Sequence, residues 1–371
     1  MHIFLLASFG PSLLNFRGHL IRDLISEGYK VSVGAPQIDN QTRQRLIALG
    51  ATPYDTPLKR NVTGIRADLA YLRGLKRLWR GLRPDVVLTY TIKPNVWGAF
   101  AAAQLNIQSI SMVTGLGYAF SEEKSGLKTQ LTRVLARRLY RAATEQNKRV
   151  IFQNPDDRDD FIDWGCLGNK TKARLVNGSG VDLNYFHRAP LVQAPVFLMI
   201  ARLLVSKGVE EYIEAARLVR QQYPQARFTL IGPDDGGPDA IDPSVITRGV
   251  NAGYISWPGS TDDVRQALRD TAVYVLPSYR EGTPRSVLEA MAMGRPIVTT
   301  DAPGCRETVI DGRNGFLVPV RDGAALAEAL KKFIKNPSLI QKMGDQSYKI
   351  AKYKYNVEKV NAEMLEIIES L

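Results

Sequence analysis

The sequence predicts an α/β protein with two Rossmann-like domains, each built on a doubly wound parallel sheet and facing a central cleft. Three observations carry this prediction. Short apolar runs alternate with helical patterns of 10 to 15 residues, which is typical of parallel sheets covered on both faces. The alternation occurs as two successive series. The length of 371 residues suits two domains of about 150 residues or slightly more.

The first series fills the N-terminal half. Its apolar runs are expected to be buried parallel strands, and the segments between them show helical periodicity. The expected strands are Ile3–Ala7, Val31–Gly34, Asp85–Tyr90, Gln108–Val113 and Val150–Gln153. The expected helices are Leu14–Glu27, Gln41–Leu49, residues 66–82 and Asn95–Leu105, with a further amphipathic segment from Leu127 to Leu139.

The second series follows a proline-containing segment, residues 188–195, which is the best linker candidate. Its expected strands are Val196–Ala201, Phe228–Gly232, Ala272–Pro277, Pro296–Thr300 and Gly315–Val318. Its expected helices are Lys207–Gln222, Thr261–Arg269, Pro284–Met293 and Gly323–Lys335. We therefore expect domains at residues 1–190 and 191–354, and a last helix, residues 355–371, packed across the domain boundary.

Composition argues against several classes of protein. Two cysteines, Cys166 and Cys305, form no disulfide framework, and the three histidines are too scattered for a zinc site. No apolar run approaches the roughly 20 residues that span a membrane. The apolar N-terminus lacks the basic start of a signal peptide, so we expect a buried strand there. Neither GxxxxGK[ST] nor GxGxxG occurs in a suitable context, which argues against P-loop and nicotinamide chemistry.

The net charge of +12 lies in one part of the chain. Residues 59–149 contain 17 basic and 5 acidic residues, so the rest of the chain is neutral. Two segments in this stretch predict basic amphipathic helices. The first places Leu72, Leu75, Trp79 and Leu82 among Arg73, Lys76, Arg77, Arg80 and Arg83, and the second surrounds Leu127, Leu131, Val134, Leu135 and Leu139 with Lys128, Arg133, Arg137, Arg138 and Arg141. They are either ordinary solvated helix faces or a surface for an anionic partner such as bilayer headgroups or nucleic acid.

Two cations stand where an expected strand of the second series passes into a helix. Arg202 follows the strand Val196–Ala201, and Lys207 precedes the helix. Cations beside a helix N-terminus suit a phosphate or a diphosphate. The plainer interpretation is that they pair with surface carboxylates such as Glu210 and Glu211.

A loop and helix start near residue 280 form the most specific pattern. Gly282 permits an unusual backbone turn, Thr283 can cap a helix, and Pro284 suits its first position. We expect free backbone N–H groups to point back to the loop at Ser286, Val287 and Leu288.

Two carboxylates flank this helix start. Glu281 precedes it and Glu289 follows more than one turn later. Because carboxylates repel a phosphate, they suit hydroxyl-rich groups on either side of it, such as a ribose and a sugar. The pattern thus indicates a nucleotide-sugar, although a loop acid and a helix-face acid at this spacing also occur by chance.

The surroundings of these residues identify a family. Glu281 and Glu289 stand in PSYREGTPRSVLEAMAMGRPIV, and ARLLVSKGVEEYIEA precedes them. With NGSGVD from Asn177, the segment Thr114–Phe120 and the turn Gly312–Leu317, nearly the whole chain resembles the GT-B retaining glycosyltransferases of family 4. Within the family it is similar to bacterial enzymes that extend undecaprenyl-diphosphate-linked sugars, and among these to α-1,3-N-acetylgalactosaminyltransferases.

The resemblance implies a role for each matching residue. Arg202 and Lys207 match the pair that binds the donor diphosphate and stabilises the leaving UDP, and Glu281 matches the acid at the donor sugar. These three are the implied catalytic residues. Glu289 matches the carboxylate that takes the ribose hydroxyls. The backbone that binds phosphate and sugar corresponds to Gly282, Thr283, Ser286, Val287 and Leu288. Family members generally need no metal, which agrees with the lack of an Asp-x-Asp triplet beside these residues.

The N-terminal domain binds the acceptor in this family. Many relatives have a histidine after the strand Asp85–Tyr90, where this sequence has none. We expect Lys93 to bind the acceptor diphosphate there, the alternative being an ordinary loop lysine. Asn15 and Arg17 are expected to face the cleft after a Gly10-Pro11 turn.

A polyprenyl-diphosphate acceptor would place the enzyme against an anionic bilayer. Each basic residue near such a surface contributes roughly 1 kcal/mol, so the basic helices with their interleaved Leu and Trp residues could hold the protein without a span. The expected location is cytoplasmic, attached peripherally to the inner face of the cytoplasmic membrane.

Two alternatives remain at this point. A UDP-N-acetylglucosamine 2-epimerase of the same architecture would consume UDP-sugar without an acceptor. A non-enzymatic nucleic-acid-binding protein would use the basic helices and lose binding steeply with salt. The second alternative leaves Arg202, Lys207, Glu281 and Glu289 without a role.

Overall fold

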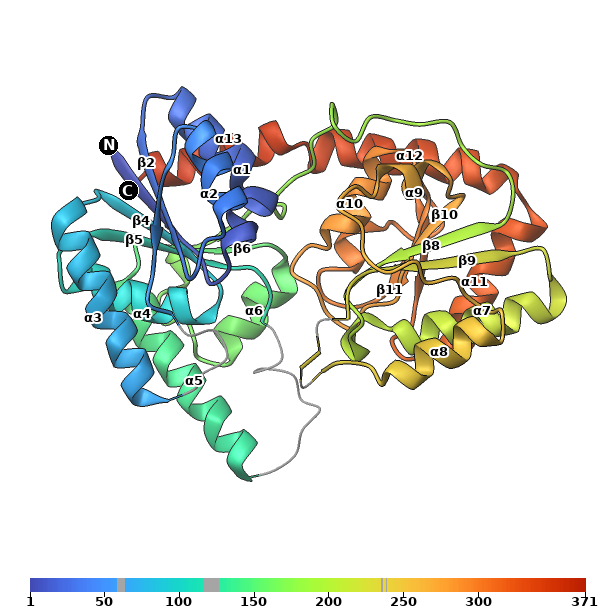
Figure 1. Ribbon diagram of the computed structural model, residues 1–371, viewed down its shortest axis with the longest axis horizontal. Helices are drawn as coiled ribbons and strands as arrows, with labels where there is room; N and C mark the ends of the chain where they lie inside the picture. Colours follow the sequence, from blue (N-terminus) through green and yellow to red (C-terminus); the bar gives the residue numbers. More distant parts are fainter. Residues whose placement is uncertain (59–63, 117–126, 235, 238) are drawn as a thin grey trace. The chain divides into compact units, whose positions relative to one another are not determined.

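The computed structural model describes residues 1–58, 64–116, 127–234, 236–237 and 239–371 of the chain (Figure 1). It contains two compact units. Unit 1 comprises residues 1–179 and 360–371, and unit 2 comprises residues 180–359. Residues 188–195, expected as a linker, belong to unit 2.

Unit 1 is built on a parallel sheet of seven strands in the order β3-β2-β1-β4-β5-β6-β7. The strands are β1 (His2–Leu6), β2 (Lys30–Ala35), β3 (Thr52–Asp55), β4 (Val86–Tyr90), β5 (Gln108–Val113), β6 (Arg149–Phe152) and β7 (Ala173–Leu175). The helices are α1 (Gly10–Ser26), α2 (Asn40–Ala48), α3 (Ile65–Leu82), α4 (Ile92–Ala103), α5 (Leu127–Gln146), α6 (Pro155–Asp163) and, from residue 360 on, the last helix, α13 (Val357–Glu369). The edge strands β3 and β7 were not expected, because they are short and contain no run of buried residues.

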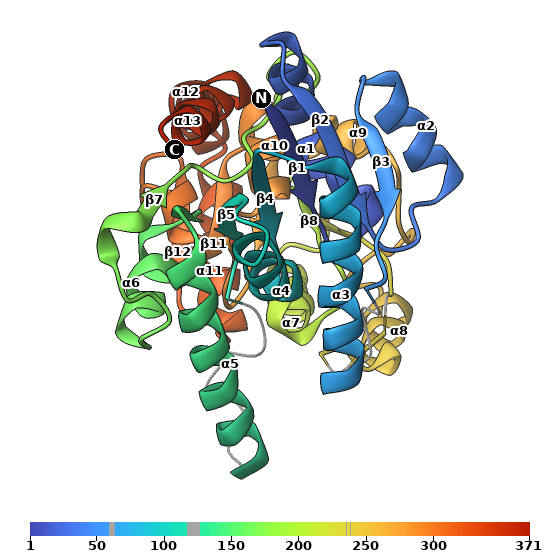
Figure 2. The same ribbon diagram turned by 90° about the vertical axis from the view of Figure 1, so that its left-hand side faces the viewer.

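Both faces of this sheet are covered by helices. Along β1, Ile3 and Leu5 join one hydrophobic cluster, while Phe4 and Leu6 join another on the opposite face. This alternation is the two-residue period of a strand. Helices α1, α2 and α13 lie on the first face, and α3 and α4 on the second (Figures 1 and 2).

The basic helix α3 packs its apolar residues against the sheet: Leu72 and Leu82 are partly buried against the same cluster as Leu75 and Trp79. Leu75 and Trp79 are fully buried, and the Trp79 ring packs edge-on against Phe4 with 5.6 Å between the ring centroids. These side chains hold α3 to the sheet, so they cannot enter a bilayer. The arginines Arg73, Arg77 and Arg80 are exposed.

The basic helix α5 differs, because its N-terminal part extends beyond the rest of unit 1 (Figure 2). Val134 and Leu135 remain 45% and 59% exposed there, and Arg138 is exposed as well. Farther along, Tyr140 and Ala143 are buried. The side chains of residues 127–132 lie outside the described part of the chain, as do residues 117–120 of the expected Thr114–Phe120 motif.

Unit 2 is built on a parallel sheet of five strands in the order β12-β11-β10-β8-β9. The strands are β8 (Val196–Ile200), β9 (Arg227–Ile231), β10 (Val273–Leu276), β11 (Ile297–Thr300) and β12 (Gly315–Val318). The helices are α7 (Val209–Gln222), α8 (Pro243–Asn251), α9 (Arg265–Arg269), α10 (Arg285–Ala292), α11 (Gly323–Lys335) and α12 (Ser338–Lys354). Helix α7 packs with α11, and α10 with α12 on the other side of the sheet (Figure 1).

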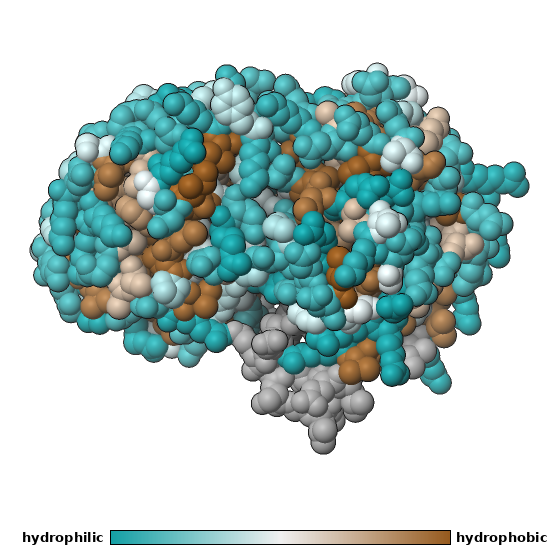
Figure 3. All heavy atoms as spheres, turned by 180° about the vertical axis from the view of Figure 1, so that it is seen from behind, coloured by the Kyte–Doolittle hydropathy of each residue, from teal (hydrophilic) through white to brown (hydrophobic). Residues whose placement is uncertain are grey.

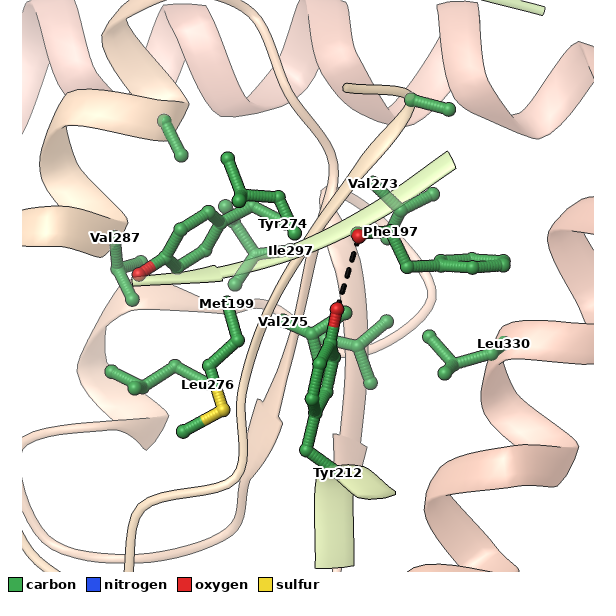
Figure 4. Packing of buried hydrophobic residues seen from close by; sticks show 14 of the residues in the cluster. Phe197, Met199, Tyr212, Val273, Tyr274, Val275, Leu276, Val287, Ile297 and Leu330 are labelled. Atoms are coloured by element: carbon green, nitrogen blue, oxygen red, sulfur yellow. Dashed lines mark hydrogen bonds between the residues drawn. The ribbon is translucent and has the colours of Figure 1, made fainter. Parts of the chain in front are cut away.

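The core of unit 2 contains a buried tyrosine that joins two strands. The Tyr212 hydroxyl on α7 lies 3.0 Å from the carbonyl oxygens of both Phe197 and Thr229 and shares its proton between them; Figure 4 shows the bond to Phe197. The phenol is fully buried, and this burial raises its pKa well above its ordinary value. It therefore stays neutral, and it ties α7 to the central strands that end at the candidate site.

The two sheets confirm the predicted fold class of two parallel-sheet, Rossmann-like domains. In the described residues, no helix is both long and apolar enough to cross a bilayer. On the face drawn in Figure 3, hydrophilic residues surround separate hydrophobic patches.

Candidate active site

The strand order of unit 2 reverses between β8 and β10. Open α/β sheets bind ligands at the carboxyl ends of the strands beside such a switch point. The loop after β8 carries Arg202 and Lys207, and the loop after β10 carries Glu281. The topology therefore brings together residues that lie more than 70 positions apart in the chain.

The loops after β8 and β10 are fastened to each other. Gly208 has a φ of +73°, and a Cβ atom there would lie 2.1 Å from the carbonyl oxygen of Pro277, so only glycine fits. The Tyr279 N–H donates to the carbonyl oxygen of Ser206 at 2.9 Å. The Tyr279 hydroxyl donates to the Glu211 carboxylate at 2.6 Å, which fixes the same loop to the first turn of α7.

Lys207 and Glu281 form an ion pair at the centre of this arrangement. Their side chains are 18% and 15% exposed, so solvent screens the pair only partly. Lys207 thus does pair with a carboxylate, but with Glu281 rather than with the nearby acids of α7. Among the residues that the structure describes, the exposed Arg202 side chain makes no hydrogen bond or ion pair.

The loop after β11 holds the Glu281 backbone from the other side. The Glu281 N–H donates to the carbonyl oxygen of Pro303 at 2.9 Å. Gly304, with a φ of +78°, lies so close that a Cβ atom would be 2.0 Å from the Glu281 carbonyl oxygen. The position of Glu281 is therefore set by loops from three adjacent strands.

Helix α10 begins one residue later than expected. Pro284 is its N-cap, and the N–H groups of Val287 and Leu288 donate to the Pro284 carbonyl oxygen at 3.1 and 3.3 Å. The prediction of free N–H groups at Val287 and Leu288 is therefore wrong. An N-cap carbonyl accepts the first bonds of its helix, and the sequence pattern had placed proline inside the helix instead.

Glu289 lies on α10 and is 8% exposed. Arg285, one turn earlier, donates its Nε–H to the Glu289 carboxylate at 2.8 Å. Burial raises the pKa of the Glu289 carboxyl above its ordinary value, and the Arg285 guanidinium opposes this rise. A buried carboxylate beside one guanidinium can accept further hydrogen bonds from ligand hydroxyls.

Unit 1 has its own switch point, between β1 and β4, and the residues expected there lie on two helices, α1 and α4. Gly10 begins α1 rather than forming a turn, so Asn15 and Arg17 are both helical. At about 100° per residue they point to different sides. Arg17 is 3% exposed, with its guanidinium 5.3 Å from the centroid of the Tyr90 ring, whereas Asn15 is exposed. Asn15 and Arg17 therefore do not extend in one direction from α1, and the expectation that they bind the acceptor stays a prediction.

Lys93 lies in the first turn of α4, not in a loop. Its ammonium group is 3.2 Å from the Asp68 carboxylate on α3, and both side chains are about one-fifth exposed. Thr91, the N-cap of this helix, has φ +74° and ψ 158°, a region that is essentially restricted to glycine. Backbone strain of this kind is common at functional sites, and no residue pattern in the sequence indicates it.

The comparisons with known proteins now place the chain in a family. The model described as "Glycosyl transferase 4-like domain" matches residues 16–177, and that described as "Glycosyl transferases group 1" matches residues 194–336. The chain is a family 4 glycosyltransferase. The epimerase and nucleic-acid alternatives are not favoured.

Two relatives support the assignment of the chain to this family. The N,N'-diacetylbacillosaminyl-diphospho-undecaprenol α-1,3-N-acetylgalactosaminyltransferase of Campylobacter jejuni is 27% identical over 355 residues, covering 91% of both chains. The putative glycosyltransferase EpsD of Bacillus subtilis is 30% identical over 298 residues, covering 76% of both. The resemblance inferred from the motifs is thereby confirmed.

The solved structures agree at the level of the fold. The crystal structure of Anabaena HepE in complex with UDP covers the whole of both chains, with a TM-score of 0.76 and 21% identity. The glycosyltransferase therefore has the GT-B fold. In the described part of the chain, no group of three or more His, Cys, Asp or Glu side chains is arranged to hold a metal ion.

The structure also shows site residues to which the motif analysis assigned no role. Ser278 and Tyr279 lie within the motif and make the hydrogen bonds that fasten its loop. Trp257 lies between α8 and α9, is 36% exposed, and donates its indole N–H to the carbonyl oxygen of Gly232, just after β9, at 3.1 Å. These roles depend on which strands become neighbours, and spacing along the chain carries no such information.

Proposed function

We propose that this glycosyltransferase moves N-acetylgalactosamine, or another N-acetylhexosamine, from a UDP-sugar to an undecaprenyl-diphosphate-linked saccharide, with retention of the anomeric configuration. The observation that carries the donor half of this proposal is the placing of Arg202, Lys207 and Glu281 together at the switch point of unit 2. The acceptor half is supported by the activity of the C. jejuni relative, an undecaprenyl-diphosphate-linked sugar transferase. UDP as the nucleotide is supported by the bound UDP in the HepE structure.

The chemistry follows from the charges. Cleavage of a UDP-sugar leaves negative charge on the β-phosphate, and preplaced cations are the strongest way to stabilise it. The exposed Arg202 and the partly buried Lys207 are the cations next to the proposed diphosphate. Glu281 would contact the donor sugar, and the buried Glu289 would accept hydrogen bonds from the ribose hydroxyls.

No metal is needed in this scheme, because the arginine and the lysine supply the positive charge. We therefore propose that the enzyme is metal-independent. Turnover should be unchanged by an excess of EDTA, and loss of turnover that Mg²⁺ or Mn²⁺ restores would contradict this part of the proposal.

A donor panel tests the reaction itself. UDP-GalNAc, UDP-GlcNAc, UDP-galactose and GDP-mannose are each offered with a lipid-diphosphate-linked N-acetylhexosamine acceptor, and the product is analysed by NMR. We expect UDP-GalNAc or another UDP-HexNAc to be transferred to give an α-linkage. Turnover of UDP-sugar without acceptor, or transfer from GDP-mannose alone, would contradict the proposal.

We further propose that unit 1 attaches peripherally to the anionic inner face of the cytoplasmic membrane. Arg73, Arg77 and Arg80 form an exposed basic row on α3, and α5 adds the exposed apolar pair Val134 and Leu135 beside Arg138. An amphipathic helix with basic and apolar side chains suits the interface of an anionic bilayer. Helix α3 would thus contribute positive charge, and α5 would contribute apolar area.

Liposome flotation separates these contributions. Reversing Arg73, Arg77 and Arg80 to Glu should abolish the preference for anionic over neutral vesicles. Val134→Ser with Leu135→Ser should weaken binding to anionic vesicles while some preference remains. Equal binding of the unchanged protein to neutral and anionic vesicles would contradict the electrostatic part.

A further inference from the structure

Ser278 is a buried hydroxyl in contact with the proposed catalytic carboxylate. It follows β10 and has no exposed surface. Its Oγ lies 2.7 Å from Glu281 Oε1 and 3.1 Å from the carbonyl oxygen of Ser206. A hydroxyl has one proton, and a carboxylate accepts more strongly than a peptide carbonyl, so the proton is donated chiefly to Glu281.

The backbone of Ser278 is itself held firmly. Its carbonyl oxygen accepts hydrogen bonds from the Thr300 hydroxyl at the end of β11 and from the Cys305 thiol, whose sulfur is 3.8 Å away. Thr300 and Cys305 are both fully buried. The hydroxyl that contacts Glu281 is therefore part of a rigid element, as a positioning group requires.

Lys207 donates to the same oxygen, Glu281 Oε1. In the proposed function, however, Lys207 also binds the donor diphosphate, and its flexible ammonium group then turns toward the phosphate. Glu281 would then lose the Lys207 ammonium group as a donor, at the moment when the sugar needs the carboxylate in place. The Ser278 hydroxyl cannot follow the lysine, so it remains as a fixed donor.

We propose that Ser278 is a positioning residue: it holds the Glu281 carboxylate toward the donor sugar when Lys207 engages the diphosphate. The inference rests on the proposed function and adds a residue to its site. It predicts that loss of the hydroxyl lowers kcat more than it raises KM for the UDP-sugar. The carboxylate would still be present but would sample unproductive orientations.

Ser278→Ala tests this against a matched control, Tyr279→Phe. The control removes the hydroxyl that binds Glu211 and loosens the same loop without touching Glu281. We expect Ser278→Ala to lower kcat about tenfold or more, with KM for UDP-sugar within about threefold. Tyr279→Phe should lower the melting temperature at least as much, with a smaller loss of kcat. Equal losses of kcat in the two variants would show a structural role and overturn the proposal.

Two further variants keep the test decisive. Ser278→Cys keeps the shape of the side chain but donates weakly, so its kcat should fall between those of the unchanged protein and Ser278→Ala. This holds even if the alanine variant folds poorly, and an unchanged kcat in Ser278→Cys would overturn the proposal. In a Glu281→Gln background, Ser278→Ala should have no further effect on UDP-sugar affinity or residual turnover.

The background variant also separates two kinds of failure. If Glu281→Gln turns over like the unchanged protein, the proposed function has misassigned Glu281 and the inference fails with it. If Glu281→Gln is impaired but Ser278→Ala is not, only the inference fails.

Discussion

The two sheets follow the same topological rule, but their switch points are built differently. In unit 2, the residues at the ends of β8 and β10 lie on loops that are hydrogen-bonded to each other, and Lys207 contacts Glu281. In unit 1, the residues expected to act together lie on separate helices, with Arg17 buried and Lys93 paired to Asp68. The strand order therefore determines where a site can form, and the local backbone conformation determines whether side chains come into contact there.

The special backbone conformations differ as well. Unit 2 uses glycine at positive φ beside its site, at Gly208 and Gly304, where no other residue fits. Unit 1 has Thr91 at φ +74°, a β-branched residue in a region that glycine normally occupies. The unit 2 site is therefore relaxed and closely packed, whereas the unit 1 site stores strain.

The largest expected effect tests the close packing of unit 2. In Gly208→Ala, the new Cβ would lie 2.1 Å from the Pro277 carbonyl oxygen, at a strained φ. The two loops must separate, so we expect a loss of about 3–4 kcal/mol in the free energy of unfolding. Chemical denaturation measures it. Gly64→Ala, at a glycine where a Cβ would meet no described atom within 4 Å, serves as the control, and equal losses in both variants would contradict the comparison.

The next effect concerns the cations of unit 2. Arg202→Ala and Lys207→Ala should each weaken donor or transition-state binding by roughly 1.5–3 kcal/mol, as expected for loss of a charge-assisted hydrogen bond. Steady-state kinetics with varied UDP-sugar measure this loss. The exposed Arg202 should affect stability little, whereas Lys207→Ala leaves the partly buried Glu281 without its ion-pair partner. If both variants have the kinetics of the unchanged protein, Arg202 and Lys207 do not bind the donor diphosphate.

The comparison also explains what could be predicted from the sequence. Periodicity located the main strands, because buried parallel strands are continuous apolar runs, but it missed the exposed edge strands β3 and β7. Loop residues such as Arg202 and Glu281 were placed correctly at the carboxyl ends of their strands. Asn15 and Arg17 were expected to act from one side, but residues two positions apart on a helix point about 200° away from each other. The ion pair of Lys207 with Glu281 could not be predicted, because it depends on the order of the strands in the sheet. The spacing of residues along the chain does not determine that order.

A third prediction concerns the strain in unit 1. Thr91→Gly should relieve the cost of the unusual backbone, roughly 1–3 kcal/mol, and lose part of that gain to the greater flexibility of glycine when unfolded. Thr91 Oγ1 is also buried and, among the residues that the structure describes, has no hydrogen-bond partner. We expect a net stabilisation of about 1 kcal/mol, measured by denaturation. A destabilised variant would show that the threonine conformation is not strained.

A smaller effect on stability is expected at Lys93. Its pair with Asp68 is partly exposed, so Lys93→Ala should cost less than about 1 kcal/mol of folding stability. If Lys93 binds the acceptor diphosphate, the same variant should raise KM for the lipid-linked acceptor about tenfold and leave KM for UDP-sugar unchanged. Asp68→Asn is the matched control, since it breaks the ion pair but keeps the lysine. An acceptor KM that changes equally in both variants would mean that the pair only holds α4 to α3.

The smallest effect is a pH dependence in unit 2. Burial raises the pKa of the Glu289 carboxyl in the folded protein above its ordinary value of 4.5. The folded state therefore binds this proton more tightly than the unfolded chain, so stability falls as pH rises through the interval between the two pKa values. Glu289→Gln removes the titration and can still accept from Arg285. It should be slightly more stable than the unchanged protein at pH 7, and the difference should vanish as pH falls toward 4. UDP affinity should fall in the same variant, because an amide binds ribose hydroxyls less strongly than a carboxylate does. A variant less stable at pH 7 would show that the ion pair with Arg285 outweighs the cost of burying the Glu289 charge. Glu289 would then be stabilised by its cation, as Glu281 is by Lys207.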